Sequence, residues 1–149
     1  MAADTATIHA SAVLIGARAA LIRGPSGSGK SRLALALLQG ADTGLVPFAR
    51  LVADDRAHIE VHHGRLIVRP APVLAGLLEV RGLGLRRLPY EPMAVLGLVI
   101  DLEAPDAARL PPPEAREATI DGIKIPRLAI AASVDPLPPL YGLLRTGEA

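Results

Sequence analysis

Short apolar runs alternate along the chain with clusters of turn-forming residues, and this pattern predicts a strand-rich α/β protein. Apolar runs that end at glycine, proline or charged residues are typical of buried strands. The predicted strands span residues 12–15, 19–23, 51–53, 58–62, 66–69, 73–80, 96–102, 120–123 and 124–130. The three residues between the first two strands form a short turn, which predicts a hairpin.

One segment has the composition of a helix. Residues 31–39 are rich in alanine and leucine and directly follow a glycine-rich stretch. Gly40 comes next and predicts a glycine stop at the end of this helix. Residues 104–115 contain several prolines and predict a surface connection. These elements together predict one α/β domain over residues 1–149.

The proline-rich tail at 134–149 is harder to place as a regular element. Pro136, Pro138 and Pro139 have no backbone N–H to donate. We therefore expect this tail to be an extended, packed strap rather than a helix.

Composition narrows the classes of function. The 149 residues are 50% hydrophobic and 21% charged, with a formal net charge of +1. This is enough apolar material for a core, and the near-neutral balance argues against nucleic-acid binding, which usually needs a basic excess. The absence of cysteine excludes disulfides, thiolate zinc sites and cysteine nucleophiles. Because no transmembrane run or signal peptide is visible, we expect a cytoplasmic protein with no membrane partner.

The strongest chemical signal is a glycine-rich loop directly after the predicted strand at 19–23. Its residues are Gly24, Pro25, Ser26, Gly27, Ser28, Gly29, Lys30 and Ser31, which match G-x-x-x-x-G-K-[ST] at every fixed position. Glycines let backbone N–H groups converge on phosphate oxygens, and the N-terminus of the following helix favours the same negative charge. We expect Lys30 to reach the β- and γ-phosphates of ATP and the Ser31 hydroxyl to ligate Mg²⁺.

Phosphoryl transfer also requires a carboxylate on the metal side and a group that handles the proton of the acceptor. Asp101 follows an apolar run and has the pattern of a Walker B strand. The adjacent pair Asp54 and Asp55 follows the predicted strand at 51–53. Spacing alone leaves both candidates open.

Four further motifs accompany the loop. They are His-Ala-Ser-Ala-Val at 9–13, Leu-Val-Ala-Asp-Asp-Arg at 51–56, Leu-Glu-Val-Arg-Gly-Leu-Gly at 78–84 and Gly-Ile-Lys-Ile-Pro-Arg at 122–127. With the loop, they resemble the C-terminal catalytic domain of the HPr kinase/phosphorylase (HPr serine kinase) family over residues 9–128. The resemblance implies a P-loop domain with a mixed β-sheet, similar to the nucleotide-binding core of phosphoenolpyruvate carboxykinase. Full-length members have a further N-terminal domain, so the chain is similar to the short form found in some proteobacteria.

The family resemblance implies an enzyme that uses ATP and Mg²⁺ to phosphorylate a serine of HPr, the phosphocarrier protein, or of an HPr paralogue. It further implies removal of that phosphate by phosphorolysis. Residues 131–136 have no arginine where the family often has one in a loop linked to phosphorolysis, which favours the kinase direction. A small-molecule kinase on the same scaffold and a nucleotide sensor without catalysis stay open as alternatives. The sequence does not determine the oligomeric state, and a homo-oligomer is one of the alternatives.

The same resemblance implies roles for individual residues. Asp55 would accept the proton of the serine hydroxyl and return it in the reverse reaction. Asp54 would support the metal or orient its neighbour, and Glu79 would ligate Mg²⁺ together with Ser31. His9 matches the family's active-site histidine upstream of the loop, where an imidazole can tune a nearby carboxylate.

Three arginines and Asp101 complete the assignment. Arg81 belongs to the segment linked to dephosphorylation in the family. Arg109 is similar in position to a later active-site arginine, and Arg116 competes with it for that place. Asp101 then becomes a structural residue at the end of a strand, despite its Walker B pattern.

Overall fold

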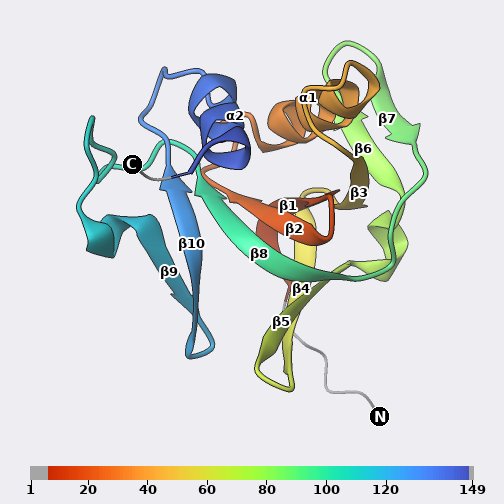
Figure 1. The fold of residues 1–149 in the computed structure, drawn as a ribbon. Coiled ribbons are helices and arrows are strands. Elements are labelled where there is room, and N and C mark those ends of the chain that lie inside the picture. The colour runs from red at the N-terminus through yellow and green to blue at the C-terminus, as the bar shows by residue number, and fades with distance from the viewer. Residues whose placement is uncertain (1–6, 148–149) are drawn as a thin grey trace.

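A mixed eight-stranded sheet forms the body of the protein, and two α-helices pack on one side of it (Figure 1). The computed structural model describes residues 7–147. The eight strands are β1 Ile8–Ile15, β2 Arg18–Arg23, β3 Ala49–Ala53, β4 Arg56–His62, β5 Arg65–Pro70, β8 Ala94–Asp101, β9 Glu117–Ile120 and β10 Ile123–Ala129. The remaining elements are α1 Lys30–Asp42, α2 Leu137–Arg145, a separate hairpin of β6 Leu77–Val80 and β7 Gly84–Arg87, and the 3₁₀ turns Pro72–Leu74 and Pro113–Arg116.

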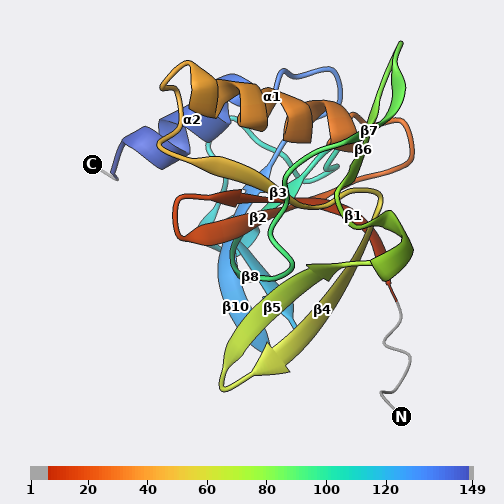
Figure 2. The same cartoon turned by 90° about the vertical axis from the view of Figure 1, so that its right-hand side faces the viewer.

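The strand pairings close part of the sheet into a ring. β1 pairs antiparallel with β2 and β4, and β4 pairs antiparallel with β5. β8 then pairs antiparallel with β5 and parallel with β2, which completes the ring. β3 pairs antiparallel with residues 12–15 of β1, and β10 pairs in parallel with β8. Figure 2 shows α1 lying across this sheet, with the β4–β5 hairpin at the opposite end of the molecule.

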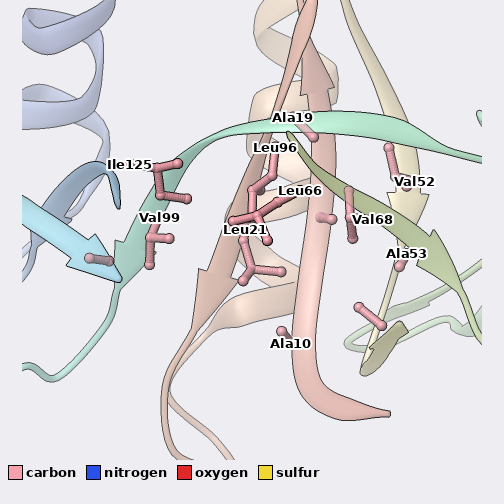
Figure 3. Close-up of a cluster of buried hydrophobic side chains, with 13 residues drawn as sticks. Ala10, Ala19, Leu21, Val52, Ala53, Leu66, Val68, Leu96, Val99 and Ile125 are labelled. Carbon is pink, nitrogen blue, oxygen red and sulfur yellow. The ribbon is translucent and has the colours of Figure 1, made fainter. Parts of the chain in front are cut away.

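Alternation along β2 separates two hydrophobic cores. Leu21 points into the cluster enclosed by the ring, together with Leu66 and Leu96 (Figure 3). The next residue, Ile22, points to the other face and packs in the cluster that includes Leu37 of α1 and Leu140 of α2. Because successive side chains of a strand face opposite sides, a strand buried on both faces is a continuous apolar run. This explains the unbroken run of apolar residues in β2.

Most of the predicted strands and the helix after the glycine loop are confirmed, with shifted boundaries. The strand predicted at 120–123 is wrong, because Asp121 and Gly122 form the turn between β9 and β10. Residues 73–80 are an exception, because the 3₁₀ turn Pro72–Leu74 comes first and the strand begins only at Leu77. Gly76, with φ of 74°, separates the two. The stop at Gly40 is also wrong, since α1 continues to Asp42. Gly40 is buried, and a Cβ there would lie 3.0 Å from the Tyr141 hydroxyl, so this position is in tight contact with α2.

The prediction of an extended proline-rich tail is wrong. Residues 137–145 form helix α2, with Pro136 at its N-cap and Pro138 and Pro139 in its first turn. The first N–H groups of a helix have no intrahelical partner, so proline loses nothing there. The N–H of Leu140 is the first that bonds backward, to the Pro136 carbonyl at 3.1 Å. Within the described residues, no helix is long and apolar enough to cross a membrane.

Alternating arginines and aspartates hold together the strand ends next to the glycine loop. Asp101 at the end of β8 accepts hydrogen bonds from Arg23 Nε at 2.7 Å and Arg127 Nε at 2.6 Å. Arg127 of β10 also donates to Asp106 Oδ2 at 2.8 Å. This ion-pair network, Arg23–Asp101–Arg127–Asp106, fixes the last residue of β2, from which the loop begins. Asp101 was expected to be a structural residue at the end of a strand, and the structure has it as the last residue of β8, bonded to two arginines.

Replacing Asp101 by asparagine is expected to lower the free energy of unfolding by roughly 2 kcal/mol, because two guanidinium groups lose their shared carboxylate. Asp106→Asn is the matched control. Its side chain is 52% exposed and pairs with the same Arg127, so we expect a smaller loss than in Asp101→Asn. Urea unfolding followed by circular dichroism measures both. Equal losses of stability in the two variants would show that Asp101 contributes no more to the free energy of unfolding than the exposed Asp106.

The contribution of Asp101 to the free energy of unfolding should also depend on pH. Burial alone would raise the pKa of Asp101, but the hydrogen bonds from Arg23 and Arg127 outweigh it, so the pKa lies below its usual 3.8. A carboxyl with a lowered folded-state pKa stabilises the fold above its unfolded-state pKa, and this stabilisation is lost as the pH falls through the folded value. The difference between wild type and Asp101→Asn should therefore be constant from pH 7 down to about pH 5 and shrink below about pH 3.8.

Candidate active site

The glycine loop joins the end of β2 to the start of α1 and leaves one side of its backbone open. Gly27 and Gly29 have φ of 82° and 99°, in the left-handed region that glycine favours. A Cβ built on either would meet no protein atom within 4 Å, so the loop surface at these positions faces open space. No side chain caps the N-terminus of α1. Backbone N–H groups are thus left for an anion at this end of the helix.

Lys30, the first residue of α1, folds back over the loop. Its Nζ donates to the Gly24 carbonyl at 2.8 Å and to the Pro25 carbonyl at 3.0 Å. The ammonium group is therefore held next to the loop backbone, where a phosphate bound by the loop would be in reach.

Asp54, directly after β3, is the hub of the site. Its side chain is buried, and Oδ1 accepts hydrogen bonds from Ser11 Oγ and Ser31 Oγ, both at 2.7 Å. Oδ2 accepts from the backbone N–H of Glu79 at 3.2 Å. One carboxylate thus joins β1, α1, β3 and β6. A P-loop serine bonded to an aspartate at the end of a nearby strand is the arrangement that positions Mg²⁺ in P-loop enzymes.

Asp55, the next residue, faces solvent. Its φ of 68° is left-handed, and its backbone carbonyl accepts a hydrogen bond from the Ala10 N–H at 3.2 Å. The side chain is 66% exposed and lies 4.0 Å from Nδ1 of His9, which is 67% exposed. Unfavourable backbone conformations of this kind are found at functional sites. The structure therefore brings Asp55 and His9 together at the accessible edge of the Asp54 hub.

Glu79 and Arg81 belong to the β6–β7 hairpin, and the backbone of Glu79 joins this hairpin to the site. The Glu79 side chain is exposed, while its backbone is tied to Asp54. Arg81 lies in the exposed turn that follows, closed by a hydrogen bond from the Leu83 N–H to the Val80 carbonyl at 2.9 Å. The hairpin extends beyond α1 in Figures 1 and 2.

Three of the residues singled out from the sequence are not brought to this cluster. Asp101 is bonded to Arg23 and Arg127, so its carboxylate oxygens are already used by the chain itself. Arg109 and Arg116 both line a cavity of about 820 Å³ between β10, the 3₁₀ turn at 113–116 and α2, and no residue of the glycine loop lines it. The structure thus separates both arginines from the loop.

Sequence reasoning gave Ser11 no role, although it lies in the motif at 9–13. It is fully buried in β1 and donates to Asp54. The sequence does mark this residue, because Ser11 lies between apolar residues of a strand and a buried hydroxyl requires a hydrogen-bond partner.

The oxygen groups of the site fit a magnesium–triphosphate complex. Ser31, Asp54 and Glu79 supply hydroxyl and carboxylate oxygens, the ligands that Mg²⁺ prefers. Among residues 7–147, no three acidic or histidine side chains gather into a preformed metal centre. Mg²⁺ in such enzymes is usually held by one or two carboxylates together with substrate phosphates. The Ser28 hydroxyl in the loop is buried and has no hydrogen-bond partner in the described chain, as expected of a group that awaits a ligand.

Comparison with known proteins identifies the family of the chain. The family model for the HPr Serine kinase C-terminal domain matches residues 1–89. The chain belongs to this family. It is 42% identical over 90 residues to the HPr kinase/phosphorylase of Clostridium tetani, which is 56% of this chain and 27% of that protein. The match to the Lacticaseibacillus casei HPr kinase/phosphorylase is 40% over 84 residues, 56% of this chain and 24% of that protein.

The chain therefore matches only about a quarter of the length of these HPr kinase relatives. A solved structure covers more of it. The Hpr(Ser) kinase/phosphatase from Coxiella burnetii aligns with a TM-score of 0.73 and 29% identity, over 93% of both chains. The mixed α/β fold described above is thus similar to an HPr kinase structure along nearly the whole chain.

The left-handed backbone of Asp55 generates a prediction about stability. Asp55→Gly and Asp55→Ala both remove the carboxylate, but only glycine adopts φ of 68° without strain. We expect the free energy of unfolding of Asp55→Gly to exceed that of Asp55→Ala by about 1 kcal/mol. Thermal and urea unfolding measure this difference. Two equally stable variants would mean that the loop relaxes its backbone when the carboxylate is removed.

Proposed function

We propose that the chain is an ATP-dependent protein kinase that phosphorylates a serine side chain of an HPr-type phosphocarrier protein. The observation that carries the proposal is the pair of adjacent carboxylates, one buried and bonded to the P-loop serine, the other exposed beside His9. Family membership supports the HPr class of acceptor.

Binding of the donor falls to the glycine loop. The N–H groups of the loop and of the first turn of α1 surround the phosphates, and Lys30 adds a positive charge next to them. Ser31, Asp54 and Glu79 would hold Mg²⁺, which supplies charge neutralisation for the phosphates. Because Asp54 is fixed by Ser11 and by the Glu79 backbone, the Ser31 hydroxyl is oriented before the substrate binds.

Asp55 handles the acceptor. Its carboxylate takes the proton of the serine hydroxyl as the new bond forms between the serine oxygen and the γ-phosphorus. The bond between that phosphorus and the β,γ-bridging oxygen breaks, and ADP leaves. His9 lies within 4.0 Å and acts as a positioning residue for the Asp55 carboxylate. Exposure of both side chains suits an acceptor that is a protein surface.

The same groups serve the reverse direction. Inorganic phosphate would enter the loop, and one of its oxygens would form a bond to the phosphorus of the phosphoserine. The bond from that phosphorus to the serine oxygen would break, Asp55 would protonate the serine oxygen, and pyrophosphate would leave. Arg81, two residues after Glu79 and exposed, is the proposed contact for the phosphorylated serine.

Transfer is tested by incubating the protein with Mg²⁺, ATP and the HPr-type proteins of its host, followed by intact-mass spectrometry. We expect one added phosphate on a serine. Asp55→Asn should lower the rate at least about a hundredfold, because general-base catalysis contributes about 10²- to 10⁴-fold. ATP binding should be unchanged in this variant.

Asp121→Asn is the matched control, because Asp121 is also exposed and left-handed, with φ of 48°, in the turn between β9 and β10. It should transfer phosphate at the wild-type rate. ATP binding without transfer to any HPr-type protein would contradict the proposal and favour a small-molecule kinase or a nucleotide sensor. Adding inorganic phosphate to the product then tests the reverse reaction.

A further inference from the structure

The cavity of about 820 Å³ that Arg109 and Arg116 line is separate from the candidate active site. Residues of β10, of α2 and of the connection between β8 and β9 surround it. Figure 1 shows this connection and α2 on the same side of the molecule as β10. Small-molecule sites have volumes of about 300–1,000 Å³, so the cavity is large enough for one.

One guanidinium group fixes the wall that the connection forms. Arg127 of β10 donates to the Asp106 carboxylate at 2.8 Å and 2.9 Å, and to the Ala115 carbonyl at 3.0 Å. These two partners lie near the two ends of the lining segment 107–117. The segment therefore cannot move away from β10 without breaking these bonds. The cavity is thus part of the folded structure, as preformed ligand sites usually are.

Apolar side chains form most of the lining. Pro126 and Leu128 are alternate residues of β10 and share one face of the sheet. Pro139 and Leu143 are four residues apart and share one face of α2. Leu143 and Val134, which also lines the cavity, are 46% and 51% exposed. An apolar ligand would remove this surface from water, which is favourable in proportion to the area buried.

The polar groups of the lining side chains are all charged. Among the described residues that line the cavity, none has a hydroxyl or amide side chain, and none is aromatic. Sugar hydroxyls are usually bound by such neutral donors and acceptors, and flat bases by aromatic rings. The lining therefore favours neither a sugar nor a nucleoside. It fits a ligand that has an apolar body and a charged group.

The sign of that charge follows from the residues of the lining. Arg127 is compensated by the two aspartates of its ion-pair network. Lys124 and Arg109 form no hydrogen bond or ion pair with another residue from 7 to 147. Glu117 is the one acidic residue among the described residues of the lining. Uncompensated cations beside apolar surface favour an anionic ligand, because a charge-assisted hydrogen bond is stronger than a neutral one.

We infer that this cavity binds a small organic anion with an apolar body. The body packs against Leu128, Pro139 and Leu143, and the anionic group pairs with Lys124 and Arg109. Carboxylates and sulfonates share the chemistry that these cations recognise. The inference does not rest on the proposed function, because the residues of the glycine loop and of the Asp54–Asp55 pair do not line the cavity.

Two fluorescent probes that differ in one charged group test this assignment. Anilinonaphthalene sulfonate has an apolar body and a sulfonate, and phenylnaphthylamine has the same body without the sulfonate. Fluorescence titration measures the affinity of both probes, and circular dichroism checks that each variant is folded. We expect the wild-type chain to bind the sulfonate probe at least about fivefold more tightly than the neutral probe. Lys124→Ala should weaken the sulfonate probe at least about fivefold and change the neutral probe by less than about twofold.

A second variant blocks the apolar part of the cavity. Leu143→Trp places an indole in the lining and should weaken both probes at least about tenfold. Leu144→Trp is its matched control, because Leu144 is the next residue of α2 and is 38% exposed but does not line the cavity. Arg65→Ala is the control for Lys124→Ala, because Arg65 is an exposed cation of β5 outside the cavity. Both controls should bind the probes as the wild type does.

Each outcome decides the point. Unchanged affinity of the sulfonate probe in both Lys124→Ala and Leu143→Trp places the probe elsewhere and overturns the assignment. Equal affinity of the wild-type chain for the two probes overturns the anionic class of ligand, and binding of neither probe overturns the site. Loss of the sulfonate probe alone in Lys124→Ala, with loss of both in Leu143→Trp, supports the assignment. If Leu143→Trp does not fold, Lys124→Ala and its control decide.

Discussion

The buried carboxylate of Asp54 is the interaction on which the site depends. A charge taken out of water is tolerated only when hydrogen bonds replace its solvation. Ser11, Ser31 and the Glu79 backbone supply these bonds, from β1, α1 and β6. Satisfying one side chain therefore sets the relative positions of four elements. The same bonds fix the Ser31 hydroxyl and place the β6–β7 hairpin beside the loop.

The rest of the sheet keeps this arrangement rigid. The ring of β2, β1, β4, β5 and β8 encloses one core, so β2 is held on both of its edges. At its end, Arg23 is locked to Asp101, which also receives Arg127. The glycine loop thus begins at a fixed point and ends in a helix packed on the second core. A flexible sequence of glycines is in this way held at both ends by well-packed elements, which is the condition for a preorganised phosphate site.

Sequence alone predicts the local features well and the long-range contacts poorly. The order of strands around the glycine loop, and the loop itself, follow from patterns only a few residues long. Helix α2 was missed because proline is unfavourable in a helix interior but harmless in the first turn, and the sequence does not mark where that turn falls. The choice between Asp54 and Asp101 was open for a similar reason. Each follows an apolar strand, and what separates them is the partner each meets: a serine 23 residues away in one case, an arginine 78 residues away in the other.

Adjacent residues with opposite burial give the site two different carboxylates. Asp54 is buried and bonded to Ser31, whereas Asp55 has a left-handed backbone and an exposed side chain. In the proposed mechanism the first serves the metal and the second serves the acceptor. Phosphoryl transfer proceeds with the attacking and leaving oxygens roughly in line through the γ-phosphorus. In the proposed mechanism the acceptor serine therefore approaches from the exposed side, where Asp55 and His9 lie, while the leaving oxygen is held at the glycine loop.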